Sequence, residues 1–176
     1  MNRPKHATAS VFFFTRATDG WRIGLITHPR FGKQMLPGGH VEHDENPAEA
    51  AVREVTEETG LPAYLVSPPG IGEPTGTSDP AVPTPLWIVE QIVPPETRQP
   101  AEHVHIDHLY LALAPAPDVP EGAELRFAWH TAEDLVHLDM FDDTRARALH
   151  LFTRLNDPTG PLTISLPADH ATTAQH

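Results

Sequence analysis

The stretch from Gly39 to Leu61, GHVEHDENPAEAAVREVTEETGL, constrains this chain more than any other part of it. It begins with a glycine, ends in a glycine and an apolar residue, and carries charged residues at fixed offsets in between. The charged positions are Glu45, Arg53, Glu54, Glu57 and Glu58. On a helix this spacing places three carboxylates on one face beside a glycine turn, an arrangement suited to holding divalent cations against phosphates.

Helix signals frame this segment on both sides. Asn46 is a good N-cap residue and Pro47 suits the first helical position. Gly60 is a natural helix terminator, and Pro62 follows it. The sequence therefore predicts a helix from about Pro47 to Thr59.

The acidic residues of this helix form a cluster. Glu54, Glu57 and Glu58 stand at i, i+3 and i+4, so their side chains are neighbours. They would repel one another, and Arg53 offsets only part of that repulsion. A hard cation that prefers oxygen ligands, Mg²⁺ or Mn²⁺, would resolve the conflict. The alternative is a solvated acidic helix face.

The same spacing fits the Nudix box, G-x5-E-x7-R-E-U-x-E-E-x-G-U with U apolar, at every position. Seven fixed residues at ordinary usage meet by chance in on the order of one window in 10⁸. The chain thus resembles the Nudix hydrolase family of MutT-like proteins. This resemblance implies an α/β fold, the α/β/α sandwich with a mixed β-sheet. It also implies hydrolysis of a diphosphate linkage in a nucleoside diphosphate joined to another group, with Mg²⁺ as cofactor and Mn²⁺ as an alternative.

The resemblance assigns roles to particular residues. It places the metal site at the carboxylates of Glu54, Glu57 and Glu58 and at the backbone carbonyl of Gly38. Arg53 then organises the motif carboxylates, and Glu45 is its expected partner.

The general base stays open between two sources. Glu57 is the candidate within the motif, while Glu121 and Glu124 are candidates from a later loop. Glu42 and Asp44 flank the turn and are candidates to contact metal or substrate. For the four acids outside the motif, a solvated surface position is the alternative.

A second cluster of polar residues runs from His103 to His108. In a strand, His103, His105 and Asp107 share one face and Val104 and Ile106 the other. Three interpretations stay open: histidines packed under a helix and hydrogen-bonded to neighbours, a wall of the substrate pocket formed by His105 and Asp107, or a dedicated metal site such as zinc.

A nucleobase needs an aromatic stacking partner. The candidates are Phe31, Trp87, Tyr110 and Trp129. Trp129 fits better as a core residue, and Trp87, which lies in a proline-rich stretch, is the candidate chosen as a substrate contact.

Composition excludes several function classes. The net charge of −12 without a basic stripe argues against a nucleic-acid duplex as partner. The absence of cysteine excludes disulfides, thiolate zinc sites and cysteine nucleophiles. No signal peptide and no membrane span stand out, so a cytoplasmic protein without a membrane partner is expected.

The 176 residues are best explained as one domain over residues 1–156, followed by a flexible C-terminal tail at 157–176. Strands are predicted at 8–15, 21–27, 61–66, 86–93 (near a sheet edge), 103–114 and 125–129. A short helix is predicted at 131–138, capped by Thr131. A longer helix runs from Asp142 or Asp143 to Leu155, with an apolar face of Ala146, Leu149, Phe152 and Leu155.

The expected function is that of a metal-dependent pyrophosphohydrolase with a small-molecule nucleotide as partner. The oligomeric state stays open, with a homodimer as one option. The alternative is a non-catalytic Nudix-fold module that binds or senses a nucleotide. An isomerase of the isopentenyl diphosphate type would use a cysteine, which this chain lacks. Nucleoside triphosphates and ADP-ribose or nucleotide sugars both stay open as substrates.

Overall fold

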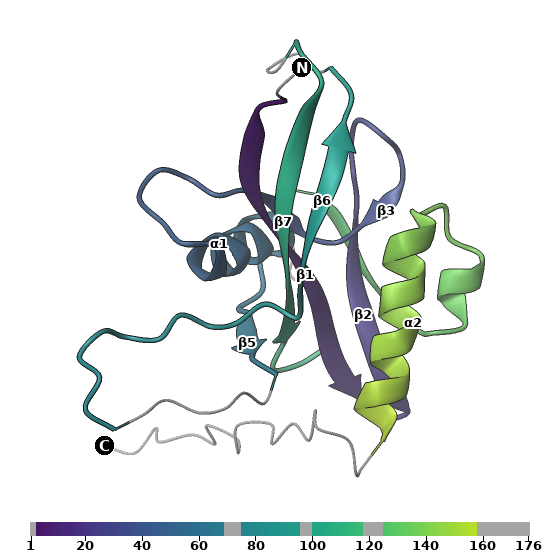
Figure 1. The fold of residues 1–176 in the computed structure, drawn as a ribbon. Coiled ribbons are helices and arrows are strands. Elements are labelled where there is room, and N and C mark those ends of the chain that lie inside the picture. The colour runs from purple at the N-terminus through teal and green to yellow at the C-terminus, as the bar shows by residue number, and fades with distance from the viewer. Residues whose placement is uncertain (1–2, 69–74, 96–99, 118–124, 158–176) are drawn as a thin grey trace, which may run out of the picture.

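A mixed eight-stranded sheet lies between two helices in the computed structural model, which describes residues 3–68, 75–95, 100–117 and 125–157 (Figure 1). The α/β/α sandwich expected from the sequence is thereby confirmed. The strands are β1 (Lys5–Ala17), β2 (Gly20–Thr27), β3 (Gln34–Met35), β4 (Gly38–His40), β5 (Tyr64–Val66), β6 (Trp87–Val93), β7 (His103–Leu113) and β8 (Arg126–His130). The helices are α1 (Pro47–Thr59), the single 3-10 turn η1 (Asp134–Val136) and α2 (Asp142–Asn156).

Strand β1 is the centre of the sheet. It pairs in parallel with β7 and in antiparallel fashion with β2 and β4, in the strand order β3-β2-β1-β7-β5. Strand β6 pairs with β7, and β8 pairs with β2. The strand is longer than the predicted 8–15 because its pairing with β7 begins at Lys5 and its hairpin with β2 continues to Ala17.

Each face of the sheet packs against one helix, since side chains along a strand alternate between faces. Val11 and Phe13 of β1 belong to the core on the α1 side, while Phe12 and Phe14 belong to the core on the α2 side. From α1 the buried side chains are Ala48, Ala50, Ala51, Val55 and Thr59. From α2 they are Ala148, Leu151, Phe152 and Leu155.

The buried face of α2 differs from the predicted one. Ala146 is exposed and Leu149 only partly buried, and Ala148 and Leu151 take the core positions. The buried residues stand at i, i+3, i+4 and i+7, which is one face of a helix, and on this face the ring of Phe152 packs edge-on against that of Phe14 at 5.0 Å between centroids. The predicted face was therefore correct only in part.

Three smaller differences follow from local chemistry. The predicted helix at 131–138 shortens to η1, although its capping is right: Thr131 and Asp134 exchange backbone-to-side-chain hydrogen bonds of 2.8 and 3.1 Å. Strand β5 begins only at Tyr64, after Pro62. Strand β6 pairs with β7 alone among the described strands, which confirms its edge position.

The predicted tail lies outside the described residues apart from Asp157. Within the described parts of the chain, no helix is both long and apolar enough to span a bilayer.

Candidate active site

Helix α1 begins and ends where its sequence signals predict. The Asn46 side chain accepts hydrogen bonds from the backbone N–H groups of Ala48 (2.9 Å) and Glu49 (3.1 Å), and the Glu49 side chain accepts one from the Asn46 N–H at 2.8 Å. This capping box satisfies N–H groups that the helix leaves without intrahelical acceptors. At the other end Gly60 adopts φ 72°, ψ 8°, which closes the helix. The motif acids therefore stand on a rigid, well-terminated helix.

Two glycines let strand β4 approach α1 on one side and β1 on the other closely. A Cβ atom on Gly39 would lie 2.2 Å from the Oε1 atom of Glu54, so any other residue would displace that carboxylate. Gly38 has a φ of +157° and a Cβ there would lie 2.3 Å from the Ala9 carbonyl oxygen. Its N–H donates a 2.9 Å hydrogen bond to the Oε2 atom of Glu58. The glycine turn therefore lies directly against two motif carboxylates, those of Glu54 and Glu58.

Arg53 connects the motif acids to one another. Its guanidinium donates to both oxygens of Glu45, at 3.0 and 2.6 Å, in a bidentate pair. The same group donates to Glu54 at 2.8 Å, to Glu57 at 3.1 Å and to the backbone carbonyl of His40 at 3.1 Å. The predicted pairing of Arg53 with Glu45 is therefore present.

The environment shifts the pKa values of two of these carboxylates in opposite directions. The hydrogen bond from Arg53 lowers the pKa of Glu45, while burial raises the pKa of Glu54 despite the same guanidinium. The side chain of Glu54 is 15% exposed and that of Glu57 is 51% exposed. The pKa of Arg53 is raised, chiefly by its hydrogen bond with Glu45, so this residue is a permanent cation.

This donor set fits a hard divalent cation. Three motif carboxylates contact one guanidinium and a fourth contacts the glycine turn, and their oxygen atoms are the ligand type that Mg²⁺ and Mn²⁺ prefer. Glu54 is partly desolvated, and the burial outweighs its contact with Arg53, so bound positive charge would favour its ionised form. The residues that could hold the ion are Glu54, Glu57, Glu58 and the carbonyl of Gly38.

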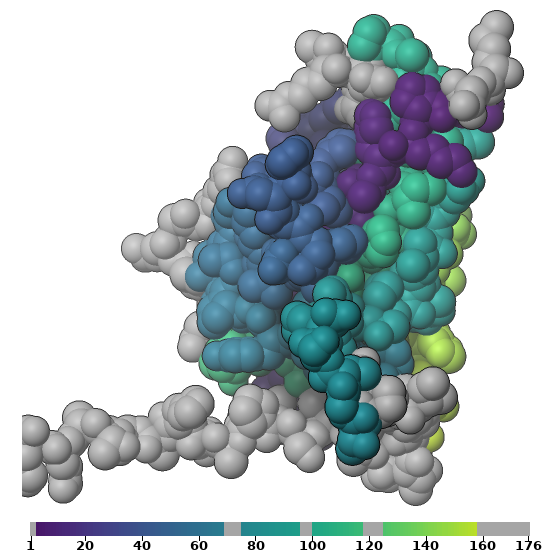
Figure 2. Space-filling view, turned by 60° about the vertical axis from the view of Figure 1, so that its left-hand side comes forward, coloured from purple at the N-terminus to yellow at the C-terminus, as the bar shows by residue number. Residues whose placement is uncertain are grey.

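The other predicted acids lie around this centre or outside the described chain. Glu42 and Asp44 lie in the loop before α1, where the Glu42 backbone N–H donates to Glu45 at 2.9 Å. Figure 2 shows α1 and the segment before it on the surface, beside the N-terminal end of β1. Glu121 and Glu124 lie outside the described residues, so their role as general base stays a prediction.

The strand face with two histidines and an aspartate is present in β7 as predicted. The Nε2 atoms of His103 and His105 are 3.2 Å apart, so these rings share a face. Asp107 is 3% exposed and accepts hydrogen bonds from the hydroxyls of Thr8 and Ser10 on β1, at 2.9 to 3.1 Å. Burial raises the pKa of Asp107, and these hydroxyls oppose that rise.

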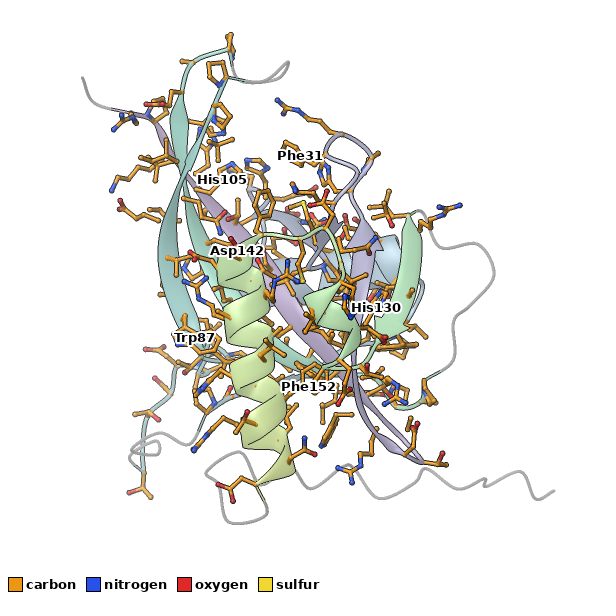
Figure 3. All side chains as sticks on the ribbon, turned by 90° about the vertical axis from the view of Figure 1, so that its right-hand side faces the viewer. Phe31, Trp87, His105, His130, Asp142 and Phe152 are labelled. Atoms are coloured by element: carbon orange, nitrogen blue, oxygen red, sulfur yellow. The ribbon has the colours of Figure 1, made fainter. Side chains whose placement is uncertain are left out.

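The aromatic candidates separate into buried and exposed residues. Tyr110 is buried, and Trp129 packs on Phe13 with 5.2 Å between ring centroids. Trp87 packs edge-on against the core residue Phe12 and lies toward the opposite end of the sheet from His105 (Figure 3).

The exposed candidate is Phe31, whose side chain is 45% exposed. It packs edge-on against Phe141, which is also exposed, with 6.4 Å between centroids. Arg30 and Lys33 lie over these two rings. Phe31, whose ring centroid lies 4.8 Å from that of His28, and Phe141, the residue before α2, thus form an exposed aromatic pair with two cations beside it.

The sequence did not predict several of the residues that contact these side chains. Thr8 and Ser10 meet Asp107 only through the parallel pairing of β1 with β7, which joins residues about a hundred positions apart. Phe141 meets Phe31 through the fold in the same way. Alternation in β1 predicts that Thr8 and Ser10 share a face, but not which strand lies next to them.

The comparisons with known proteins all lead to one family. The family model described as the NUDIX domain matches residues 4–152. A curated relative from Lactococcus lactis subsp. cremoris (strain MG1363), named probable DHNTP pyrophosphohydrolase, is 34% identical over 108 residues, which cover 60% of this chain. This match spans 54% of the relative, so the chain aligns with about half of that protein's length.

Solved structures share the fold. A Nudix family hydrolase from Clostridium perfringens has a TM-score of 0.68 at 24% identity, covering 88% of this chain and 99% of that one. The NUDIX domain of Shewanella oneidensis NrtR in complex with ADP ribose has a TM-score of 0.56 at 17% identity, covering 88% and 90%. At these identities the likeness concerns the fold alone.

Proposed function

This chain belongs to the NUDIX domain family, and we propose that it is a divalent-metal-dependent pyrophosphohydrolase. Its substrate is a nucleoside diphosphate joined to another group, with a nucleoside triphosphate as the first choice. The observation that supports this most directly is the complete set of motif acids, held by Arg53 and the glycine turn. A module that only senses nucleotides has no need for such a set.

The chain's own residues have distinct tasks in this proposal. Glu54, Glu57, Glu58 and the carbonyl of Gly38 hold Mg²⁺ or Mn²⁺. An ion held by these residues would supply positive charge against the phosphates and a lowered pKa for a coordinated water. Arg53 fixes the orientation of the carboxylates through its five N–H donors, and Glu45 in turn fixes Arg53.

The general base is best assigned to Glu57 among the described residues. Its side chain is the most exposed of the Arg53 partners in the motif, so a substrate-side water can reach it. Its 3.1 Å contact with Arg53 holds it near the other acids without burying it. Glu121 and Glu124 remain the alternative bases from the later loop.

Two observations support a triphosphate as the substrate. The exposed pair Phe31 and Phe141 offers a stacking surface for a base, and Arg30 and Lys33 beside it suit phosphate oxygens. The Lactococcus lactis relative is named for a triphosphate substrate, which favours this class over ADP-ribose. Glu42, His105, Asp107 and Trp87 stay candidates for substrate contact, and Trp87 lies toward the opposite end of the sheet from His105.

The experiment is a substrate panel. The full chain with Mg²⁺ or Mn²⁺ is given nucleoside triphosphates, a pterin triphosphate, ADP-ribose, nucleotide sugars and dinucleoside polyphosphates, and the release of pyrophosphate or phosphate is quantified. We expect pyrophosphate and a nucleoside monophosphate from at least one triphosphate. Binding of a nucleotide by calorimetry without release of any product would instead identify a sensing module.

A further inference from the structure

Three histidines from three different strands converge at one end of the sheet. The ligand nitrogen atoms of His6 (β1), His40 (β4) and His105 (β7) all lie within 4.8 Å of one another. The ring centroids of His40 and His105 are 4.8 Å apart, and those of His6 and His40 are 5.8 Å apart. Figure 3 shows His105 toward the end of the sheet at which α2 begins.

The pairing of the strands places these side chains together. His6 is the register partner of His105 in the parallel β1–β7 pair. His40 is the partner of Thr8, and Thr8 shares a face with His6 because side chains alternate along a strand. The three imidazoles therefore project from the same face of three adjacent strands, held by backbone ladders rather than by a mobile loop.

We propose that His6, His40 and His105 form a second metal site. This site is selective for Zn²⁺ and similar divalent ions, which prefer imidazole ligands. Tetrahedral Zn²⁺ with nitrogen ligands at about 2.0–2.1 Å needs nitrogens roughly 3.3 Å apart. The present separations of up to 4.8 Å are wider than this, so binding would draw the three rings together. Three protein ligands leave one position for water or another ligand, as in open zinc sites.

His103 supports this assignment by fixing one ligand's tautomer. Its Nδ1 atom is 3.2 Å from the Ala101 carbonyl oxygen, and a carbonyl only accepts, so Nδ1 carries the proton. The Nε2 atom of a neutral His103 then accepts from the Nε2–H of His105, 3.2 Å away. With Nε2 of His105 held by His103, the other ring nitrogen, Nδ1, is the atom that would bind the metal. Histidine ligands of metals are commonly oriented by such a hydrogen bond from their other nitrogen.

The two sites offer different ligand atoms, and His40 connects them. The acid motif offers only oxygen atoms, which suit Mg²⁺ and Mn²⁺, while the histidines offer only nitrogen atoms. His40 directly follows the glycine turn, and its carbonyl accepts a hydrogen bond from Arg53 at 3.1 Å. A metal ion on the histidines would therefore fix β4 against β1 and β7 beside the turn. Metal binding by the three histidines would not require the hydrolytic activity proposed above.

The test measures metal binding rather than turnover. The full chain, freed of metal with a chelator, is titrated with Zn²⁺ in the presence of excess Mg²⁺, and Co²⁺ is added separately to record visible absorption. We expect one Zn²⁺ per chain, a raised Tm on binding, and the intense visible bands of four-coordinate Co²⁺. The variants His6→Gln, His40→Gln and His105→Gln should each lower the Zn²⁺ affinity at least about tenfold.

Two controls separate the sites. His137→Gln changes an exposed histidine outside the cluster and should leave Zn²⁺ binding intact. The double variant Glu54→Gln/Glu58→Gln should also keep the Zn²⁺ site, because its ligands are elsewhere. His40 is exposed, so His40→Gln gives a result even where a more buried variant does not fold.

Two outcomes would overturn the proposal. The first is Zn²⁺ binding that is lost with the motif acids but kept in all three histidine variants. The second is a cluster that binds inorganic phosphate, seen as a histidine-dependent rise in Tm with phosphate and no response to Zn²⁺. That result would identify an anion pocket instead.

Discussion

The acid motif and the histidine cluster meet on strand β4, where Gly39 directly precedes His40, yet they are built in different ways. The acid motif comes from one turn and one helix, so its members are close in sequence. The histidine cluster comes from β1, β4 and β7, and it exists only because distant strands pair. Both place like side chains together, one set offering oxygen atoms and the other nitrogen atoms. A contiguous site can be predicted from spacing, whereas a site made across strands needs the sheet.

The largest expected effect comes from the motif acids. Glu54→Gln or Glu58→Gln keeps the size of the side chain but removes a charged metal ligand, and metal ligation contributes several kcal/mol to the transition state. We expect turnover to fall by roughly a hundredfold or more. Steady-state kinetics at saturating Mg²⁺, with Tm as a check on folding, measures this. Glu133→Gln, an exposed acid outside the motif, is the matched control, and near-normal rates in both motif variants would refute the metal assignment.

Arg53 tests whether the acid motif needs its organiser. The Arg53→Lys variant would keep one positive charge, but its ammonium group could not donate to Glu45, Glu54 and Glu57 together. Loss of such an orienting partner typically costs about 10- to 100-fold in activity or metal affinity. The control is Arg147→Lys, at a partly exposed arginine 3.8 Å from Asp143. Equal kcat values in wild type and Arg53→Lys would show that the charge alone suffices.

The contacts between β1 and β7 are tested at Thr8, whose hydroxyl donates a hydrogen bond to the buried Asp107. Thr8→Val keeps the shape but leaves the Asp107 carboxylate one donor short, which should cost about 1–3 kcal/mol of unfolding free energy. Urea denaturation measures the loss. Thr8→Ser retains the hydroxyl and should cost clearly less; equal losses in the two variants would mean that packing, not the hydrogen bond, matters at this position.

The smallest effect concerns His130 of β8, away from both sites. Burial lowers the pKa of His130, and its Nε2 is buried without a hydrogen-bond partner among the described residues. The unfolded chain then binds the proton more readily than the folded one, so this part of the stability is present above the unfolded pKa of about 6.5 and is lost as pH falls toward the folded pKa.

The expected result is a difference in pH dependence between wild type and His130→Gln. Unfolding free energies of both proteins are measured from neutral to mildly acidic pH. The wild type should lose more stability on acidification, by at most about 1.4 kcal/mol for each unit by which the pKa is depressed. Parallel pH profiles would contradict the lowered pKa.

These two regions also show how far the sequence alone can be taken. The limits of α1, its capping box and the Arg53–Glu45 pair follow from residues within a short stretch, and the helix limits, the Asn46 cap and the ion pair were predicted. The meeting of His6 with His105 depends on a parallel pairing between strands about a hundred residues apart, which local preferences do not encode. The buried face of α2 was missed for a different reason: Ala148, Leu151, Phe152 and Leu155 stand at i, i+3, i+4 and i+7, so helix periodicity in the sequence already contains it.

In the proposed function, the acid motif holds the cation on which hydrolysis depends. Electron paramagnetic resonance of Mn²⁺, recorded on the same samples as turnover, tests it directly by giving the bound fraction at each Mn²⁺ concentration. In the wild type, occupancy and turnover should rise together, and both should be lost in Glu58→Gln. Turnover that persists in a Glu58→Gln sample without bound Mn²⁺ would contradict the claim.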